Sequence, residues 1–189
     1  MLYHIKKGQF REYLSEMEKM QHELKKYYDK LNALQKSAFT VSMAMIYFGA
    51  GKYDESIEQL NKIRNVEDFD VRQDVESAMK LFYLIVHFEK GNTELVFYLE
   101  KSLHRYLAKK KRLFKFENII LKFLGKGFLK INSKNNLVNE FKKLKSELLP
   151  IENDPKENAP FKEFDYISWL ESKIENKSFA EIVKRISLN

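Results

Sequence analysis

The chain has 189 residues, with 34 Lys and Arg against 27 Asp and Glu, which gives a formal net charge of +7. Six glycines and three prolines make up about 5% of the chain, where average usage is roughly 12%, and this scarcity of turn-formers argues against an all-β sandwich or barrel. The hydrophobic share of 44% excludes global disorder, and the lack of cysteine excludes disulfides, thiolate catalysis and thiolate zinc sites.

No stretch of the sequence has the pattern of a targeting or membrane segment. The strongest apolar run, residues 81–86, is bounded by Lys80 and His87. It is far shorter than the roughly 20 residues that cross a bilayer. We therefore expect a soluble, cytoplasmic protein that makes no membrane contact.

The first predicted helix covers residues 9–35. Its apolar residues recur at three- and four-residue steps, with Lys and Glu between them. The breadth of the apolar face favours a helix packed on the body of the protein, and a coiled coil is the alternative. The apolar residues are Phe10, Tyr13, Leu14, Met17, Leu24, Tyr27, Tyr28, Leu31 and Leu34.

Pairs of helices separated by glycine follow. The first pair covers residues 38–48 and 53–64, with a turn at Gly51 that glycine can make in the left-handed conformation. The second begins at a capping box, Asp70-x-x-Gln73, and turns at Gly91, which lies 40 residues after Gly51. Leu95, Leu99, Leu103 and Leu107 are predicted to form the core face of its second helix.

A third pair is predicted over residues 113–149, with a break near Gly125-Lys126-Gly127. All three prolines lie in residues 150–160, which we interpret as a linker. Two short helices follow, at 162–174 and at 179–187, and the second begins at the capping box Ser178-x-x-Glu181. The sequence thus predicts about nine helices and no strand, in a repeat domain (1–149), a linker (150–160) and a C-terminal helix pair (161–189) that packs back on the repeats.

The first helix pair resembles a tetratricopeptide repeat. Gly51, Tyr53 and Ser56 occupy positions where that family has Gly, Tyr and a small residue, and Ala44 supplies the small residue of the first helix. Small residues are needed there because the two helices cross nearly in contact. The resemblance implies a right-handed α-solenoid of antiparallel helix pairs.

The later pairs depart from the repeat pattern. Thr93 and Val96 replace the Tyr and the small residue, and Asp68 stands near the place of the closing proline. The stretches His87–Asn92, Ser102-x-x-Arg105 and Phe116-Glu117 are similar to a set of divergent bacterial proteins with such repeats near their carboxyl end. That similarity implies an upstream domain as one partner.

Catalytic and metal-binding patterns are weak. The four histidines lie apart, and Glu67, Asp70 and Asp74 lack the central Gly and terminal Glu of a calcium loop. The sequence has no nucleophile elbow, phosphate loop or dinucleotide fingerprint. We therefore expect neither an enzyme nor a bound cofactor or metal.

The basic charge is concentrated in residues 101–149, which contain 14 Lys and Arg against Glu117, Glu140 and Glu147. Such a region attracts anions. Tyr106, Phe114 and Phe116 lie among the lysines, where they suit either base stacking or a helical core, and helical spacing favours the core. Nucleic-acid binding or regulation through this region is our second functional hypothesis.

The leading hypothesis is a scaffold or adaptor that binds another protein, or an upstream domain of the same chain, on the repeat surface. A homo-oligomer that pairs through the 9–35 helix is a third hypothesis. By analogy with the repeat register, seven residues are candidates for partner contact, and His87 has the alternative of a histidine hydrogen-bonded to a helix end. The candidates are Met45, Lys80, His87, Arg105, Lys111, Arg112 and Lys115.

Overall fold

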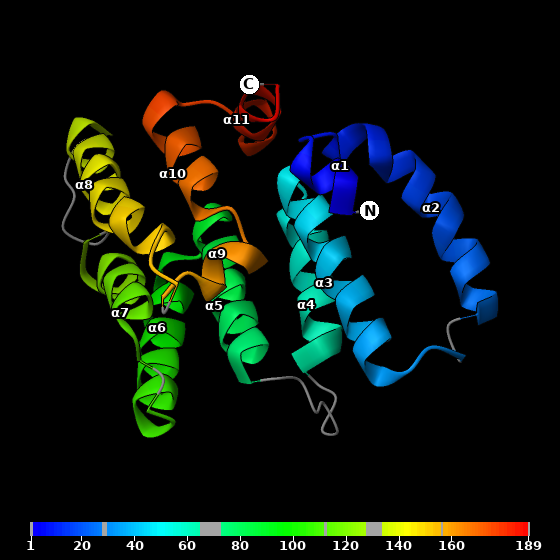
Figure 1. Ribbon diagram of the computed structural model, residues 1–189, viewed down its shortest axis with the longest axis horizontal. Coiled ribbons are helices and arrows are strands. Elements are labelled where there is room, and N and C mark those ends of the chain that lie inside the picture. Colours follow the sequence, from blue (N-terminus) through cyan, green and yellow to red (C-terminus); the bar gives the residue numbers. More distant parts are fainter. Residues whose placement is uncertain are drawn as a thin grey trace. The chain divides into compact units, whose positions relative to one another are not determined.

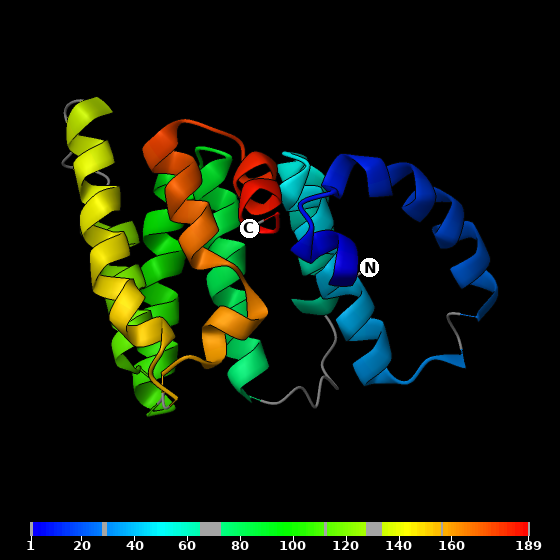
Figure 2. The same ribbon diagram turned by 45° about the horizontal axis from the view of Figure 1, so that its top comes forward.

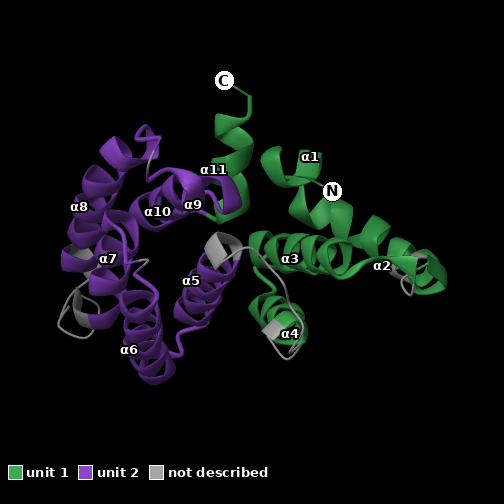
Figure 3. Ribbon diagram, turned by 60° about the horizontal axis from the view of Figure 1, so that its bottom comes forward, with its two compact units in different colours: residues 1–72, 178–189 green, residues 73–177 purple. Residues whose placement is uncertain are grey.

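The computed structural model describes residues 2–27, 30–64, 73–111, 113–127, 134–155 and 157–188. Every regular element in these residues is a helix, which confirms the predicted all-α class (Figures 1 and 2). The chain divides into two compact units (Figure 3). Unit 1 comprises Met1–Arg72 and Ser178–Asn189, and unit 2 comprises Gln73–Lys177. The predicted division at residues 149 and 161 stays a prediction.

The two units contain more helices than the nine predicted. The additional ones are a short first helix, a π-helical turn and a split in the predicted helix 162–174. Unit 1 holds α1 (Leu2–Lys6), α2 (Phe10–Tyr27), α3 (Ala33–Gly49), α4 (Tyr53–Arg64) and α11 (Phe179–Ile186). Unit 2 holds α5 (Gln73–Glu89), α6 (Thr93–Lys109), α7 (Lys115–Lys122), the π-helical η2 (Phe123–Gly127), α8 (Lys134–Glu152), α9 (Ala159–Glu163) and α10 (Tyr166–Glu175).

The predicted continuous helix over residues 9–35 is wrong, because α2 ends at Tyr27 and a new helix begins at Ala33. Asn32 starts that helix with a capping box: its side chain accepts from the backbone N–H of Gln35, and the Gln35 side chain accepts from the backbone N–H of Asn32. This reciprocal cap satisfies two backbone donors at the start of α3. Leu34, one of the apolar residues of the predicted 9–35 helix, is 67% exposed in the first turn of α3.

The helices α3 and α4 form the predicted hairpin. Gly51 lies between them with φ 79°, a left-handed conformation that glycine adopts without a side-chain clash. Ala44 and Ser56 are fully buried where the helices cross, and the Ser56 hydroxyl donates to the Ala44 carbonyl at 2.8 Å. The close approach expected from two small residues is therefore present.

The core of unit 1 includes both ends of the chain. Phe10, Tyr13, Leu14 and Met17 on the first half of α2 are buried against α3. Phe179 at the start of α11 packs its ring on Phe10 (5.7 Å between centroids) and on Phe48 (5.4 Å). The last helix thus contributes to the same core as the second helix.

In unit 2, α5 and α6 form a second hairpin, with Gly91 at φ 81° between them. Both glycines that the sequence predicted at bends lie at bends. The predicted capping box at Asp70 and Gln73 lies outside the described residues. The third predicted pair is present as α7 with η2 and then α8, which pack on each other, and α8 continues through Pro150 to Glu152.

The helix predicted at 162–174 is interrupted at Phe164, which has extended backbone (φ −149°, ψ 143°). Asp165 then begins α10, and its carboxylate accepts from the backbone N–H of Ser168 at 2.9 Å. Trp169 in α10 is fully buried against Phe88 and Phe141. Within unit 2, the segment around Trp169 therefore packs on α5 and α8.

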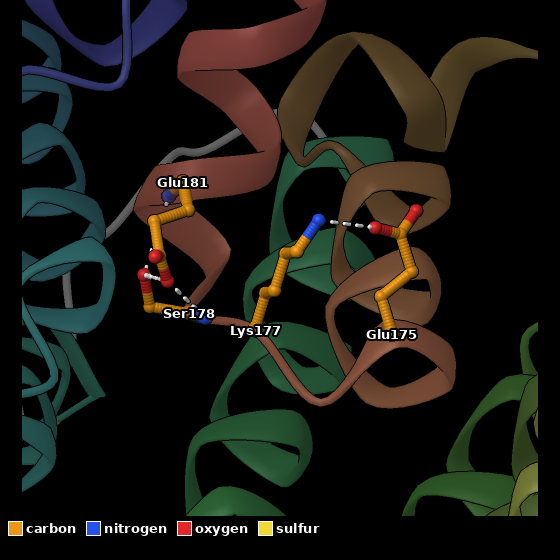
Figure 4. A network of polar contacts seen from close by, with 4 residues as sticks. All are labelled: Glu175, Lys177, Ser178 and Glu181. Carbon is orange, nitrogen blue, oxygen red and sulfur yellow. Dashed lines mark hydrogen bonds and ion pairs between the residues drawn. The ribbon is translucent and has the colours of Figure 1, made fainter.

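The connection from α10 to α11 is a short polar turn (Figure 4). Asn176 takes the left-handed conformation (φ 53°), and Lys177 forms an ion pair with Glu175 at 2.9 Å. The backbone N–H of Ser178 donates to the Glu181 carboxylate at 2.8 Å, and the backbone N–H of Glu181 donates to the Ser178 hydroxyl at 3.2 Å. The capping box predicted at the start of α11 is confirmed.

Candidate interaction surface

Helix α6 has one buried face and one exposed face. Val96, Leu103 and Leu107 are buried in unit 2. On the other side, Leu95 is 41% exposed and Tyr98 is 69% exposed. We take this exposed side of α6 as the candidate binding surface because exposed basic side chains continue it.

Basic side chains continue this exposed face toward the end of α6. The Lys101 ammonium lies 3.9 Å from the centroid of the Phe97 ring, in a cation–π contact. Arg105 and Lys109 follow on the helix and are exposed. We define the α6 surface as the exposed residues Leu95, Tyr98, Lys101, Arg105, Lys109, Lys110, Lys111 and Lys115.

One exposed acidic residue, Glu94 in the first turn of α6, lies on the same helix face as the exposed basic residues of that helix. It offsets one of the six basic residues of the α6 surface, and two further acidic residues nearby point elsewhere. Glu117 is buried. The Glu100 carboxylate lies against η2. A Cβ atom built on Gly125 of η2 would lie only 2.6 Å from a carboxylate oxygen of Glu100. The α6 surface therefore carries a local excess of positive charge beside two apolar side chains.

The turn after α6 is held in place by a residue far along the chain. Lys111 has φ 54°, the left-handed conformation. The next helix, α7, has no side-chain cap at Phe114. Instead, the Glu157 carboxylate accepts from the backbone N–H groups of Lys115 (3.4 Å) and Phe116 (3.2 Å). This anion at a helix N-terminus fixes the end of the turn.

The structure places three of the predicted contact residues, Arg105, Lys111 and Lys115, in solvent on the α6 surface. Arg112 lies outside the described residues. Met45 is half-buried on α3 in unit 1. Whether any of these residues contacts a partner stays a prediction.

Lys80 and His87 are engaged inside unit 2. Lys80 forms an ion pair with Glu76 at 3.3 Å and lies 4.9 Å from the centroid of the Tyr106 ring. His87 is 5% exposed, and the side-chain amide of Asn92 donates to its Nδ1 at 2.9 Å. This geometry corresponds to a histidine hydrogen-bonded at a helix end, the alternative that the sequence offered for His87.

The three aromatic residues among the lysines have different roles. Phe116 is fully buried, and the Tyr106 hydroxyl donates to Glu76 at 2.7 Å. Phe114 is 49% exposed beside the α6–α7 turn. Only Phe114 of the three is placed to contact a ligand.

Sequence reasoning missed Leu95 and Tyr98. The sequence analysis placed Leu95 at the start of a core stripe in which leucines recur every four residues. In a helix of 3.6 residues per turn, each four-residue step shifts the side chain by about 40° around the helix axis. Over three steps from Leu107 the stripe moves off the buried face, and Val96 takes the inner position instead. The signal that finds Tyr98 is its place three residues after Leu95 on that outer side.

Two ionisable groups in unit 2 have raised pKa values. Burial, followed by the charges of Glu117 and Glu163, raises the pKa of Tyr166 well above its ordinary value. Burial, followed by the charge of Asp165, raises the pKa of Glu152. Tyr166 is fully buried, so its hydroxyl is not placed to meet a substrate.

In the described part of the chain, no group of three or more His, Asp or Glu side chains is placed to hold a metal ion. His4, for example, stacks on Tyr13 at 4.3 Å between ring centroids and contacts the Gln9 side chain. None of the described helices combines the length and the apolar character needed to cross a membrane. Comparison with models of protein families, with curated proteins and with solved structures finds no match to this chain.

Proposed function

We propose that this chain is a non-enzymatic, cytoplasmic protein-interaction module that binds an acidic segment of another protein, or of an upstream domain of the same chain. In this proposal its successive antiparallel helix pairs stack as a right-handed, tetratricopeptide-like solenoid. The observation that carries the proposal is the α6 surface, where exposed Tyr98 lies on the same helix face as a row of exposed basic residues.

The chemistry of the α6 surface suits a segment that combines an apolar residue with carboxylates. Tyr98 offers a large side chain whose burial by a partner would supply most of the apolar contact. Arg105 can bind a carboxylate with two parallel hydrogen bonds, and Lys101 and Lys109 add charge. Lys80 and His87 are left out of the proposed contact because both already have partners inside unit 2.

A direct test uses a fluorescein-labelled peptide of alternating Glu and Phe, with binding measured by fluorescence anisotropy. We expect the double variant Arg105→Glu, Lys109→Glu to bind the peptide about tenfold more weakly, because two favourable charge contacts become repulsive. Tyr98→Ala is expected to weaken binding by a similar factor.

The matched control is Lys142→Glu with Lys143→Glu on α8. It makes the same change in net charge at two exposed residues within the same basic region. We expect this control to bind the peptide as the parent does. Equal losses for both double variants would show that only total charge matters, and would contradict a site on α6.

Nucleic-acid binding is a second candidate, favoured by the exposure of Phe114 and Tyr98 among the lysines. A labelled single-stranded oligothymidylate replaces the peptide in the same assay, over a series of salt concentrations. Binding driven by phosphate contacts loses affinity with a log–log slope of about −0.7 per contact for single strands. A steep slope with the oligonucleotide, together with weak peptide binding, would favour this second function.

A further inference from the structure

The last helix, α11, is built like a helical peptide bound to unit 1. Its capping box, Ser178 with Glu181, closes its amino end with residues of the same segment. Ile182 and Val183 are 0% and 6% exposed, and Phe179 packs on two phenylalanine rings of unit 1. Apolar anchors three and four residues apart on one helix are typical of helices that dock in a groove.

The turn between α1 and α2 allows the backbone of α11 to approach closely. Gly8 in that turn has φ 65°, the left-handed conformation. A Cβ atom built on Gly8 would lie 2.7 Å from the backbone nitrogen of Lys184 and 2.8 Å from the carbonyl oxygen of Ala180. Glycine is therefore required at this position both by its own conformation and by the nearness of α11.

The other residues around α11 complete a groove. The Phe10 ring lies directly on Gly49 at the end of α3, where a Cβ atom would collide with it, and Phe179 stacks on that ring. At the other end of α11, the Lys7 ammonium donates to the Ser187 carbonyl at 3.1 Å. A cation at the carboxyl end of a helix is favourable. We define the α11 groove as the surface formed by Lys7, Gly8, Phe10, Phe48 and Gly49.

Only two residues, Asn176 and Lys177, separate the end of α10 in unit 2 from the N-cap of α11 in unit 1 (Figure 4). Asn176 is exposed and left-handed, with φ 53°, and Lys177 forms its ion pair with Glu175. None of these connector contacts belongs to the α11 groove. The groove of a second copy therefore offers α11 the same groove contacts once the connector opens.

From the groove and the connector we propose that α11 is an exchangeable helix. It docks in the α11 groove of its own chain in the monomer and in that of a second copy in a domain-swapped dimer. The two forms differ in the connector and in the entropy of association. The monomer prevails at low concentration because the short connector keeps α11 close to its own groove. This exchange does not involve the proposed peptide site on α6.

Two complementary variants test whether the groove accepts α11 from another copy. Ile182→Glu with Val183→Glu keeps the groove but removes the helix that fills it. Gly8→Val keeps α11 but blocks the groove, because a side chain there meets the α11 backbone. Each variant alone is expected to be monomeric in sedimentation velocity. An equimolar mixture is expected to form a complex of about twice 22.6 kDa.

The control mixes the first variant with a chain that carries all three changes. This mixture has a vacant groove but no α11 able to fill it, so no complex is expected. Far-UV circular dichroism checks that each variant retains its helix content. A complex in the control mixture would place the contact elsewhere, and a test mixture that stays monomeric would overturn the exchange of α11.

A second test changes only the connector and leaves both the groove and α11 intact. Asn176→Gly favours the closed connector, because glycine adopts the left-handed conformation without strain. Asn176→Val disfavours it, because a β-branched residue rarely adopts that conformation. In sedimentation equilibrium up to near-millimolar concentration, the dimerisation constant of Asn176→Val is expected to exceed that of Asn176→Gly by about tenfold.

Adding Ile182→Glu and Val183→Glu to Asn176→Val is expected to abolish the dimer, since no helix is left to exchange. A dimer that survives these changes would have another interface and would contradict the proposal. Equal dimerisation of the two Asn176 variants, or a monomeric Asn176→Val at every concentration, would show that the connector does not open for exchange.

Discussion

Ala44 and Ser56 show how single small residues set the distance between two helices. Both are fully buried at the crossing of α3 and α4, where the serine hydroxyl bonds to the alanine carbonyl. Sequence reasoning identified these two residues, since only a small side chain fits between helices in contact. It did not identify Tyr98 as exposed, because the strict four-residue spacing of the leucines was followed instead of the 3.6-residue turn of the helix.

Ala44→Leu is expected to destabilise unit 1 by about 1–3 kcal/mol, because three added carbon atoms must fit into a packed crossing. Urea denaturation followed by circular dichroism measures the change. Ala38→Leu is the matched control on the same helix, since Ala38 is exposed. A similar loss in both variants would show that α3 does not closely approach α4 at Ala44.

Tyr166 is a second case at the residue scale, because its fully buried hydroxyl has no hydrogen-bond partner among the described residues. Removing an unsatisfied buried polar group avoids its desolvation penalty. Tyr166→Phe is therefore expected to raise the free energy of unfolding at pH 7 by about 1 kcal/mol. The exposed Tyr98→Phe is the control and is expected to change little in urea denaturation.

The same variant has a predicted pH dependence. The pKa of Tyr166 is raised in the folded state, so the folded protein holds the phenol proton above pH 10 while the unfolded chain releases it. The free energy of unfolding of the parent protein therefore decreases as the pH rises above 10, because the unfolded state is favoured by losing this proton. The advantage of Tyr166→Phe over the parent should grow between pH 9 and pH 11, and a constant difference would contradict the raised pKa.

At the scale of helices, periodicity in the sequence predicted most elements but not all of their ends. The end of α2 was missed because the apolar pattern of the sequence continues past Tyr27. In the structure a new helix, α3, begins after its N-cap residue Asn32. The cap of α7 could not be predicted at all, since Glu157 lies 41 residues beyond Phe116. Local rules detect local caps and cannot detect those supplied by a distant segment.

Glu157→Ala is expected to cost about 1 kcal/mol in the stability of unit 2, because two backbone N–H groups at the start of α7 lose their acceptor. Glu157→Gln keeps an acceptor oxygen without the charge and should lose less. Urea denaturation at low and high salt separates the two contributions. An unchanged midpoint for Glu157→Ala would mean that solvent caps α7 equally well.

At the scale of the molecule, helices that follow one another in the sequence do not always belong to the same compact unit. The sequence predicted two short helices, at 162–174 and 179–187, that together pack back on the repeats. The contacts group α10 with unit 2 and α11 with unit 1, because Trp169 fills one core and Phe179 the other. No local pattern in the last thirty residues carries that information.

A chain that ends at Lys177 lacks α11 and is expected to lose more than about 3 kcal/mol of stability in unit 1, since Ile182 and Val183 are buried there. Urea denaturation monitored by circular dichroism measures the loss. A chain that ends at Ser187 is the control, because it omits only exposed Leu188 and the final residue. Equal stability of the two truncated chains would contradict a core role for α11.

Trp169 is the single tryptophan of the chain, and it lies fully buried in unit 2 with its indole N–H donating to the Glu89 carboxylate at 2.7 Å. The Lys173 ammonium donates a hydrogen bond to the other oxygen of the Glu89 carboxylate. Indole emission therefore reports on unit 2 alone and provides a built-in optical probe. Red-shifted fluorescence marks the opening of that unit, while the tyrosine signal follows the whole chain.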